Sequence, residues 1–271
     1  MIEPPGHRID LAAYFSRIGY SAETKPTAAA LRGLHFAHIT RIPFENVSAL
    51  LERPVPLDPS SLERKLVGER RGGYCFEQNG LFSAVLEELG FEVTRLAARV
   101  RLGAHRILPR THMLLLVRSE GVSWVCDVGF GGWGLLEPIP LEADREVCQG
   151  DWTVRLQREG NQWVLQSLNC PAGPDLYAFT LEPQQPIDYE PANHYCATHP
   201  NSRFVQTFTV QLPGPKVRTI LRGRELSVFS PDGPPHVSVL QDDEVFAEIE
   251  RRFGLSFSNE ERDALRRKVP T

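Results

Sequence analysis

The hydrophobic pattern of this chain changes from helical to strand-like near residue 90, and this change constrains the fold more than any other feature of the sequence. Before it, apolar residues recur every three or four positions, as on the buried face of a helix. After it, short β-rich runs are separated by turn residues, and a helical pattern returns at the end of the chain. Helices followed by antiparallel strands predict an α+β fold rather than a doubly wound parallel sheet.

Cap residues and turn residues give the boundaries of the expected elements. Asp10 and Thr27 are N-cap residues of the first two helices, and Ser258 with Glu261 forms a capping box for the last one. The expected helices cover residues 11–18, 28–39, 60–67, 75–89, 243–253 and a final segment after 258. The expected strands cover residues 93–102, 112–117, 123–130, 152–156, 162–166, 205–212, 217–221 and 225–229.

Composition and charge narrow the class of protein. With 271 residues and a hydrophobic share of 41%, the chain can bury a sizeable core, which excludes global disorder. The net charge of −4 argues against a general nucleic-acid binder but leaves room for a local basic patch. The sequence has no apolar run near the roughly 18–20 residues of a membrane span and no signal-peptide pattern at its start. We therefore expect a cytoplasmic protein without a membrane partner.

The cysteines and histidines do not form a metal-binding pattern. An odd number of cysteines without a CxxC pair argues against a disulfide framework and against a structural zinc site. The five are Cys75, Cys126, Cys148, Cys170 and Cys196. His35 and His38 are three positions apart on an expected helix, but no third ligand accompanies them, so we interpret them as structural. We expect no bound metal.

The segment Arg70–Gly80, with the sequence RRGGYCFEQNG, is the most informative stretch of the chain. Its two adjacent glycines allow a tight backbone path, after which Cys75 stands at the N-terminus of an expected helix. The positive end of the helix dipole and the nearby arginines would lower the pKa of this thiol and favour a nucleophilic thiolate. A small buried residue at a loop–helix junction fits the local sequence equally well.

A nucleophilic cysteine needs a base and an orienting group, and the expected strands supply candidates for both. If the loop at 120–121 has two or four residues, His112 lies opposite about Gly129, and Asp127 then shares the face of His112. Such diagonal neighbours have Cα atoms about 7–8 Å apart, within reach of a carboxylate–imidazole hydrogen bond. A three-residue loop would reverse this facing. Taken singly, His112 and Asp127 are more often structural; together with Cys75 they favour a catalytic set.

Several segments resemble the signature of the arylamine N-acetyltransferase family, in its prokaryotic form. They are Ile42–Asn46 (IPFEN), Arg71–Gly80 (RGGYCFEQNG), Thr111–Met113 (THM), Asp127–Gly131 (DVGFG), Ala197–Phe204 and Arg252–Gly254. The segments occur in the order of the family and span nearly the whole chain. The RGGYC segment with its spaced His and Asp is highly specific. Cys196 departs from the family pattern at a position without a catalytic role.

The resemblance implies a fold and a catalytic set. The domains would be a helical domain over 1–90 that carries the nucleophile, an antiparallel β-barrel over 91–200 that carries His and Asp, and an α/β lid over 201–271. The core of this fold is similar to that of cysteine proteases and transglutaminases. Carried over by matching motifs, Cys75 is the acyl acceptor, His112 the base and Asp127 its orienter.

The resemblance also implies binding residues. Those matching the apolar amine pocket of the family are Phe44, Val100, Phe130 and Phe204. Phe44 and Val100 fit ordinary core packing equally well, whereas Phe130 lies between two glycines, which favours a loop position. Thr111 and Gly131 match positions near coenzyme A. The glycine-rich segment 131–134 would offer backbone amides there, although it lacks the strand, helix and lysine of a phosphate loop.

The activity implied by the resemblance is acetyl-CoA-dependent N-acetylation of arylamines and arylhydrazines, by a ping-pong mechanism through an acetyl-cysteine, as in xenobiotic metabolism. An amide synthase that moves a polyketide-type acyl group onto an arylamine would share the same motifs. A thiol hydrolase and a catalytically silent binding module of the same fold are further alternatives. The partners would be small molecules, coenzyme A among them, and the sequence leaves the oligomeric state open.

Overall fold

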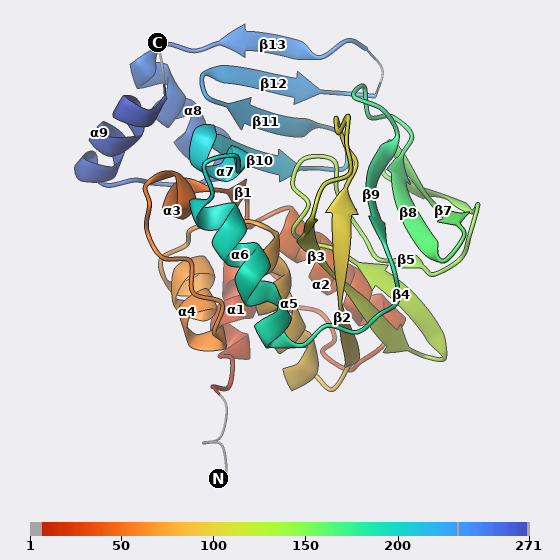
Figure 1. Cartoon of the computed structure of the whole chain (residues 1–271). Coiled ribbons are helices and arrows are strands. Elements are labelled where there is room, and N and C mark those ends of the chain that lie inside the picture. Colours follow the sequence, from red (N-terminus) through yellow and green to blue (C-terminus); the bar gives the residue numbers. More distant parts are fainter. Residues whose placement is uncertain (1–6, 232, 270–271) are drawn as a thin grey trace.

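The computed structural model describes residues 7–231 and 233–269, and the first part of the chain is helical (Figure 1). Asp10 accepts a hydrogen bond from Ala13 N and Thr27 accepts one from Ala30 N, so the first two helices begin where the sequence predicts. The elements of this part are α1 (Leu11–Ile18), α2 (Ala28–Ile39), α3 (Val47–Leu50), α4 (Pro59–Glu63), the π-helical turn η1 (Arg64–Gly68) and α5 (Cys75–Glu88).

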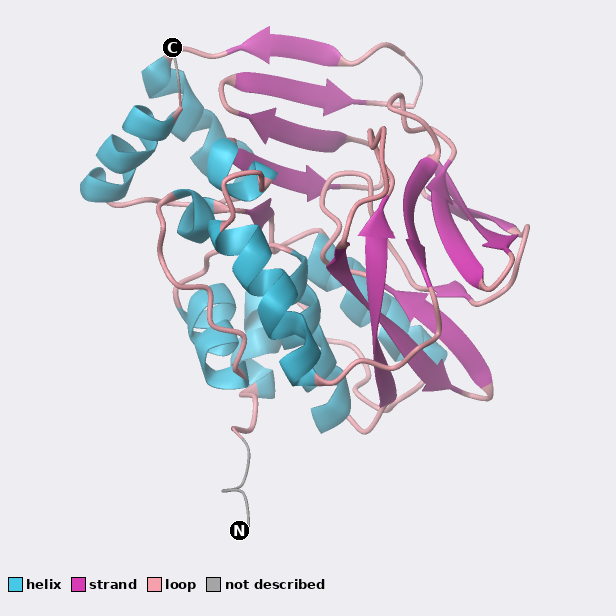
Figure 2. Ribbon diagram, in the orientation of Figure 1, coloured by secondary structure: helices cyan, strands magenta, loops and turns pink. Residues whose placement is uncertain are grey.

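Eight antiparallel strands follow and form one sheet in the order β5-β4-β3-β2-β9-β8-β7-β6. The strands are β2 (Glu92–Val100), β3 (Arg110–Ser119), β4 (Val122–Cys126), β5 (Ile139–Pro140), β6 (Glu146–Gln149), β7 (Trp152–Glu159), β8 (Gln162–Ser167) and β9 (Asp175–Phe179). The sheet curves beside the helices as the expected barrel, and Figure 2 shows this mixture of helices and strands. The predicted α+β fold class is therefore confirmed.

The end of the chain builds a second sheet, in the order β1-β10-β11-β12-β13. Its strands are β1 (Phe44–Glu45), β10 (Thr209–Pro213), β11 (Arg218–Arg222), β12 (Glu225–Phe229) and β13 (His236–Val239). The helices α8 (Asp242–Phe253) and α9 (Asn259–Lys268) accompany it (Figure 1). The capping box of Ser258 and Glu261 is present at the start of α9, as predicted.

The prediction from sequence places several elements near this second sheet incorrectly. The predicted strand over 205–212 is wrong in its first half, because Ser202 caps a short helix, α7 (Arg203–Gln206), and β10 begins only at Thr209. The side chain of Ser202 accepts a hydrogen bond from Phe204 N, and this local cap outweighs the strand preference of the apolar residues that follow. The sequence analysis also missed the preceding turn η2 (Pro186–Asp188), helix α6 (Tyr189–Thr198) and strand β13, and in the eight-stranded sheet it missed β5, β6 and β9.

Two clusters of buried apolar side chains hold these parts together. The larger cluster joins the helices to the eight-stranded sheet, and the smaller one lies between the second sheet and the helices α8 and α9. Strand β1 comes from the helical first part yet pairs with β10, so the first and last parts share a sheet. The domain boundaries at residues 90 and 200 stay a prediction. None of the described helices is both long enough and apolar enough to cross a membrane.

Candidate active site

A tight backbone path brings Cys75 to the start of α5. A Cβ atom on Gly72 would lie 2.1 Å from Pro43 O, and one on Gly73 would lie 2.7 Å from the Glu77 carboxylate, so neither position accepts a side chain. Cys75 is the first residue of α5 and is only 3% exposed. The two glycines thus let the chain pass close to β1 and turn directly into the helix.

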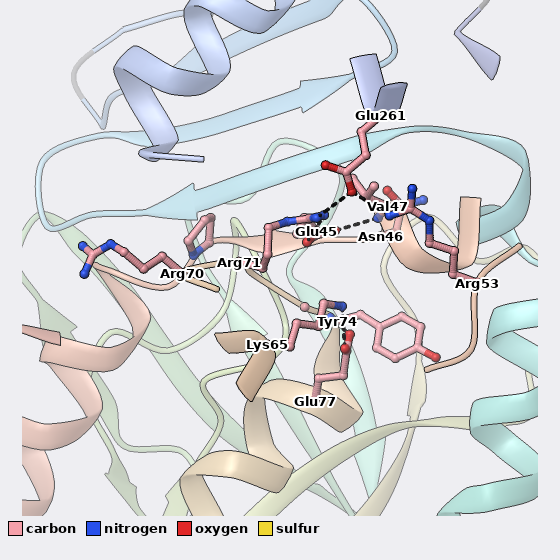
Figure 3. Close-up of polar contacts among 12 residues, drawn as sticks. Glu45, Asn46, Val47, Arg53, Lys65, Arg70, Arg71, Tyr74, Glu77 and Glu261 are labelled. Carbon is pink, nitrogen blue, oxygen red and sulfur yellow. Dashed lines mark hydrogen bonds and ion pairs between the residues drawn. The ribbon is translucent and has the colours of Figure 1, made fainter. Parts of the chain in front are cut away.

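Charged side chains hold the segment that precedes Cys75 (Figure 3). The guanidinium of Arg71 binds Glu45 at 2.9 Å and Glu261 of α9 at 3.1 Å. Burial opposes the ionisation of Glu45, but Arg71 and Lys65 outweigh it and hold the pKa of this carboxyl below its usual value. Glu77 in turn binds Lys65 at 2.6 Å and accepts a hydrogen bond from Tyr74 N. The turn into α5 is therefore fixed by ion pairs from three separate segments.

His112 and Asp127 form the partnership that the strand register predicted. Ser119 pairs with Val122, so the loop at 120–121 has two residues and the two side chains share a face. His112 Nε2 lies 2.7 Å from Asp127 Oδ2. The predicted strand over 123–130 is too long, because pairing with β3 ends at Cys126 and Asp127 lies just beyond it.

Asp127 controls the protonation of His112. Burial alone would lower the pKa of His112, but the charge and the hydrogen bond of Asp127 raise it to about 10. Burial likewise opposes the ionisation of Asp127, yet His112 and the Asn79 amide hold its pKa below the usual value. At neutral pH the pair is therefore an imidazolium bound to a carboxylate.

Two opposing effects act on the thiol of Cys75. Its Sγ lies 3.6 Å from Thr111 O. Burial raises the pKa of the thiol, whereas the neighbouring His112 lowers it, and burial is the larger effect. The expectation of a lowered thiol pKa considered the helix terminus and the arginines but not the burial of Cys75. The thiolate therefore depends on the charge of His112.

A cavity of about 530 Å³ opens onto these residues. Cys75, Thr111 and His112 lie in its wall, and so do all four residues matched to the amine pocket: Phe44, Val100, Phe130 and Phe204. The ring of Phe130 stands edge-on to the imidazole of His112, with centroids 5.2 Å apart. Gly131 is not part of the cavity wall. It has a φ of +86°, and a Cβ atom there would lie 2.7 Å from Gln211 Oε1.

Comparison with known proteins identifies the family of this chain. A family model described as N-acetyltransferase matches residues 27–262. An arylamine N-acetyltransferase of Escherichia coli (strain K12) is 47% identical over 192 residues, which are 70% of this chain and 68% of that protein. The chain belongs to the arylamine N-acetyltransferase family.

Solved structures of arylamine N-acetyltransferases have the same fold. The Nocardia farcinica enzyme superposes with a TM-score of 0.90 at 41% identity over 97% of each chain. The Mycobacterium marinum enzyme, solved in complex with CoA, superposes with a TM-score of 0.88 at 34% identity and covers 96% of this chain and 98% of its own. The resemblance stated from the sequence is thus confirmed, and the chain is an acetyltransferase.

Asn79 is a polar residue of this acetyltransferase that the sequence analysis missed. Its Nδ2 donates hydrogen bonds to Asp127 Oδ1 at 2.9 Å and to Met113 O at 2.8 Å. Its Oδ1 accepts one from Val128 N at 3.0 Å. Asn79 follows Cys75 by four positions and therefore lies on the same face of α5. That spacing is the signal that would have found it.

His35 and His38 are structural, as expected, but His35 also touches the site. His35 Nε2 accepts a hydrogen bond from Asp127 N at 3.1 Å, so its Nδ1 donates to Leu136 O at 3.0 Å. His38 lies between Gln78 and Tyr14, each at 2.7 Å. Burial lowers the pKa of His35 to about 4 and that of His38 to about 3, so both are neutral at neutral pH.

Within residues 7–231 and 233–269, no three His, Cys, Asp or Glu side chains cluster in a way that would hold a metal ion. The five cysteines are free thiols, and only Cys148 among them is exposed. Cys196 lies in the wall of the same cavity as Cys75. It therefore offers an internal control for the reactivity of Cys75.

Proposed function

We propose that this acetyltransferase transfers an acetyl group from acetyl-CoA to arylamines and arylhydrazines in the cytoplasm, by a ping-pong mechanism through acetyl-Cys75. The observation that carries the proposal is the His112–Asp127 pair, 2.7 Å apart, beside the buried Cys75 in a cavity of about 530 Å³. A cysteine, a histidine and an orienting carboxylate are the parts that nucleophilic acyl transfer requires.

The first half-reaction starts from the form in which Cys75 is a thiolate, stabilised by the His112 imidazolium against the effect of burial, and this thiolate attacks the thioester carbonyl of acetyl-CoA. The carbon–sulfur bond to coenzyme A breaks, and the departing thiolate takes a proton from the His112 imidazolium. Asp127 stabilises the imidazolium before this step and holds the ring in place. The products are acetyl-Cys75 and free coenzyme A, so the enzyme stores the acetyl group before the acceptor is used.

In the second half-reaction the neutral amine attacks acetyl-Cys75. Neutral His112 accepts the proton that the amine loses, the amide departs, and Cys75 leaves as the thiolate beside a renewed imidazolium. An arylamine is mostly uncharged at neutral pH, so it needs no carboxylate for recognition. None of the described residues in the cavity wall is Asp or Glu, which fits this class of acceptor.

The cavity wall also suits the phosphates of coenzyme A. It contains three arginines and no acidic residue among the described positions: Arg106, Arg203 and Arg222. None of the three forms an ion pair with another described side chain, so their charges are free to bind an anion. Thr111 and Gly131 are the backbone positions that we assign to coenzyme A on the family resemblance.

Acetylation without an acceptor tests the mechanism. Acetyl-CoA alone should release one equivalent of coenzyme A and leave one acetyl group on the peptide that contains Cys75. Cys75→Ala should give neither product. Cys196→Ala is the matched control, because it removes the other thiol of the same cavity, and it should behave as the unmodified enzyme. Steady-state acetyl transfer by Cys75→Ala at an undiminished rate would overturn the covalent route.

Acyl chain length separates this activity from the amide synthase alternative. Acetyl-CoA and a long acyl thioester are offered with the same aniline. Rapid acetyl transfer supports the proposal. An enzyme that is inert with acetyl-CoA but transfers the long acyl group is an amide synthase.

A further inference from the structure

Arg218 is a buried cation without a carboxylate. It is on β11, is 0% exposed, and forms no ion pair with any side chain in the described part of the chain. Its Nη1 donates to Gly132 O at 2.5 Å and to Gly134 O at 3.0 Å. Its Nε and Nη2 have no hydrogen-bond partner among the described residues. Two backbone carbonyls are therefore its polar partners.

Arg218 remains charged at neutral pH, although no carboxylate among the described residues balances its charge. The guanidinium lies 4.7 Å from the ring centroid of Trp152 and 5.6 Å from that of Trp133. Burial lowers its pKa to about 9, so it still carries a charge at neutral pH. An apolar side chain of similar size would pack against the two indole rings without the desolvation cost of a charge. Stability alone does not explain an arginine here.

The two carbonyls belong to the loop that carries Phe130. Gly134 N donates to Gly131 O at 3.0 Å, which closes a turn directly after Phe130. Gly132 N donates to Gln211 Oε1 of β10 at 2.8 Å. Two side chains of the second sheet, Gln211 on β10 and Arg218 on β11, therefore form hydrogen bonds with one side of this loop. On the other side the loop presents Phe130 to His112 and to the cavity.

Arg17 is a second buried arginine that binds backbone carbonyls, and it lies next to the segment that leads to Cys75. It is 7% exposed and also binds backbone carbonyls, with Nε donating to Leu66 O and Nη1 to Arg41 O, both at 2.9 Å. Its Nη2 reaches Arg70 O and Arg71 O at 3.4 Å. Arg17 therefore supports the segment that leads to Cys75, as Arg218 supports the loop of Phe130.

We propose that Arg218 is a positioning residue for acceptor binding: by holding Gly132 O and Gly134 O, it keeps Phe130 against His112 and so shapes the arylamine side of the cavity. The inference rests on the proposed function for the identity of the acceptor. Both buried arginines bind backbone carbonyls, but the inference predicts that they affect different half-reactions. Arg17 should affect the reactivity of Cys75, and Arg218 should affect acceptor binding.

Two variants, Arg218→Met and Arg17→Met, test this division. The rate of Cys75 alkylation by iodoacetamide, read by peptide mapping to exclude Cys148, reports on the nucleophile side. The concentration of aniline that halves this rate reports on acceptor binding. Arg218→Met should raise that concentration about fivefold or more and leave the alkylation rate without aniline within about twofold. Arg17→Met should slow alkylation and leave the protection by aniline unchanged.

Hydrogen exchange read by mass spectrometry gives a second measurement that needs neither acetyl-CoA nor aniline. Arg218→Met should speed exchange in residues 129–135 but not in 70–75, and Arg17→Met should do the reverse. If Arg218→Met does not fold, Arg218→Lys keeps the charge but not the forked geometry, and it should show the same local change. Equal effects of both arginine variants on both regions would overturn the proposal.

The two measurements also separate this inference from the proposed function. Aniline that neither protects the unmodified enzyme nor takes the acetyl group from acetyl-Cys75 contradicts the arylamine acceptor, and the exchange pattern then decides the role of Arg218. Protection of the unmodified enzyme that Arg218→Met leaves unchanged contradicts the inference alone.

Discussion

The two sides of the cavity are held by different kinds of interaction. On the nucleophile side, ion pairs fix the backbone before Cys75, and Asp127 fixes the imidazole of His112. On the side that carries Phe130, which we propose binds the acceptor, the Arg218 guanidinium binds two glycine carbonyls and aromatic rings pack against Phe130. The first side must keep a proton at a defined atom in a buried environment, where a misplaced charge is costly. The second side holds no proton of the reaction, and its interactions only have to maintain the shape of the cavity. Substitutions on the nucleophile side should therefore cost more than those on the acceptor side.

Asp127→Asn should have the largest effect, a loss of acetyl transfer of about 10³–10⁴-fold, because an amide does not stabilise the imidazolium and favours the wrong tautomer. Without Asp127, burial would lower the pKa of His112 from about 10, as it does for His35. The steady-state rate with acetyl-CoA and aniline measures the loss, and circular dichroism confirms that the variant is folded.

The same variant should also move the pH profile of Cys75 alkylation. Loss of the positive charge on His112 raises the pKa of the thiol, so the rate should reach its plateau at a higher pH than in the unmodified enzyme. A folded Asp127→Asn variant with near-normal transfer and an unchanged profile would show that Asp127 is structural.

Asn79→Ala should have the next largest effect, a loss of transfer of roughly 10–100-fold, because one donor to Asp127 is removed while the His112–Asp127 contact remains. Asp127 Oδ1 keeps a hydrogen bond from Gly129 N at 2.9 Å, so the loss should be smaller than for Asp127→Asn. Ser83→Ala is the matched control, since Ser83 is also a buried polar residue of α5 but does not contact Asp127. Equal losses in the two variants would contradict a positioning role for Asn79.

The contrast between Asp127 and Asn79 shows what the sequence could predict. The two-residue loop at 120–121 is a local feature, and it was enough to bring His112 and Asp127 together. The helix boundaries at Asp10 and Thr27 follow from local caps in the same way. Asn79 was missed because its partner lies 48 positions away on another element. The four-residue spacing from Cys75 places Asn79 on the face of α5 that bears the nucleophile, but it does not reveal the partner at the end of β4.

The acceptor side was harder to predict for the same reason. The family resemblance supplied Phe44 and Phe204, whose rings lie 5.9 Å apart although 160 positions separate them. The pairing of β1 with β10 joins segments that are equally distant in sequence, and Arg218 binds Gly132 O across 86 positions. The strand predicted over residues 205–212 was wrong in its first half, where α7 ends and β10 has not yet begun. Tertiary contacts, and not local propensity, decide this side of the site.

His38→Gln should change the pH dependence of stability rather than the chemistry. Burial lowers the pKa of His38 to about 3, below its value in the unfolded chain, so its contribution to stability is lost as pH falls below about 6.5. One such histidine costs about 2 kcal/mol between pH 7 and pH 5. Urea unfolding at the two pH values measures this cost.

The His38→Gln variant should lose about 2 kcal/mol less than the unmodified enzyme over this range. His112 contributes with the opposite sign, because its pKa is raised to about 10 and its stabilisation is largest at low pH. That contribution is common to both proteins and cancels in the difference. An identical pH dependence in the two proteins would show that His38 takes up a proton in the folded state.

Phe130→Ala should have the smallest effect and the most selective one. An aromatic contact contributes about 0.5–1.5 kcal/mol beyond its burial, so turnover of aryl acceptors should fall by roughly tenfold, which corresponds to about 1.4 kcal/mol. Phe130 contacts the rings of His112 and Tyr177, each with centroids 5.2 Å apart, but it has no part in the pairing of His112 with Asp127. Formation of acetyl-Cys75 should therefore change much less. Stopped-flow acetylation and steady-state turnover of aniline separate the two steps. If both fell together, Phe130 would serve the coenzyme or the scaffold, and the distinction between a charged nucleophile side and a shape-determined acceptor side would fail at this residue.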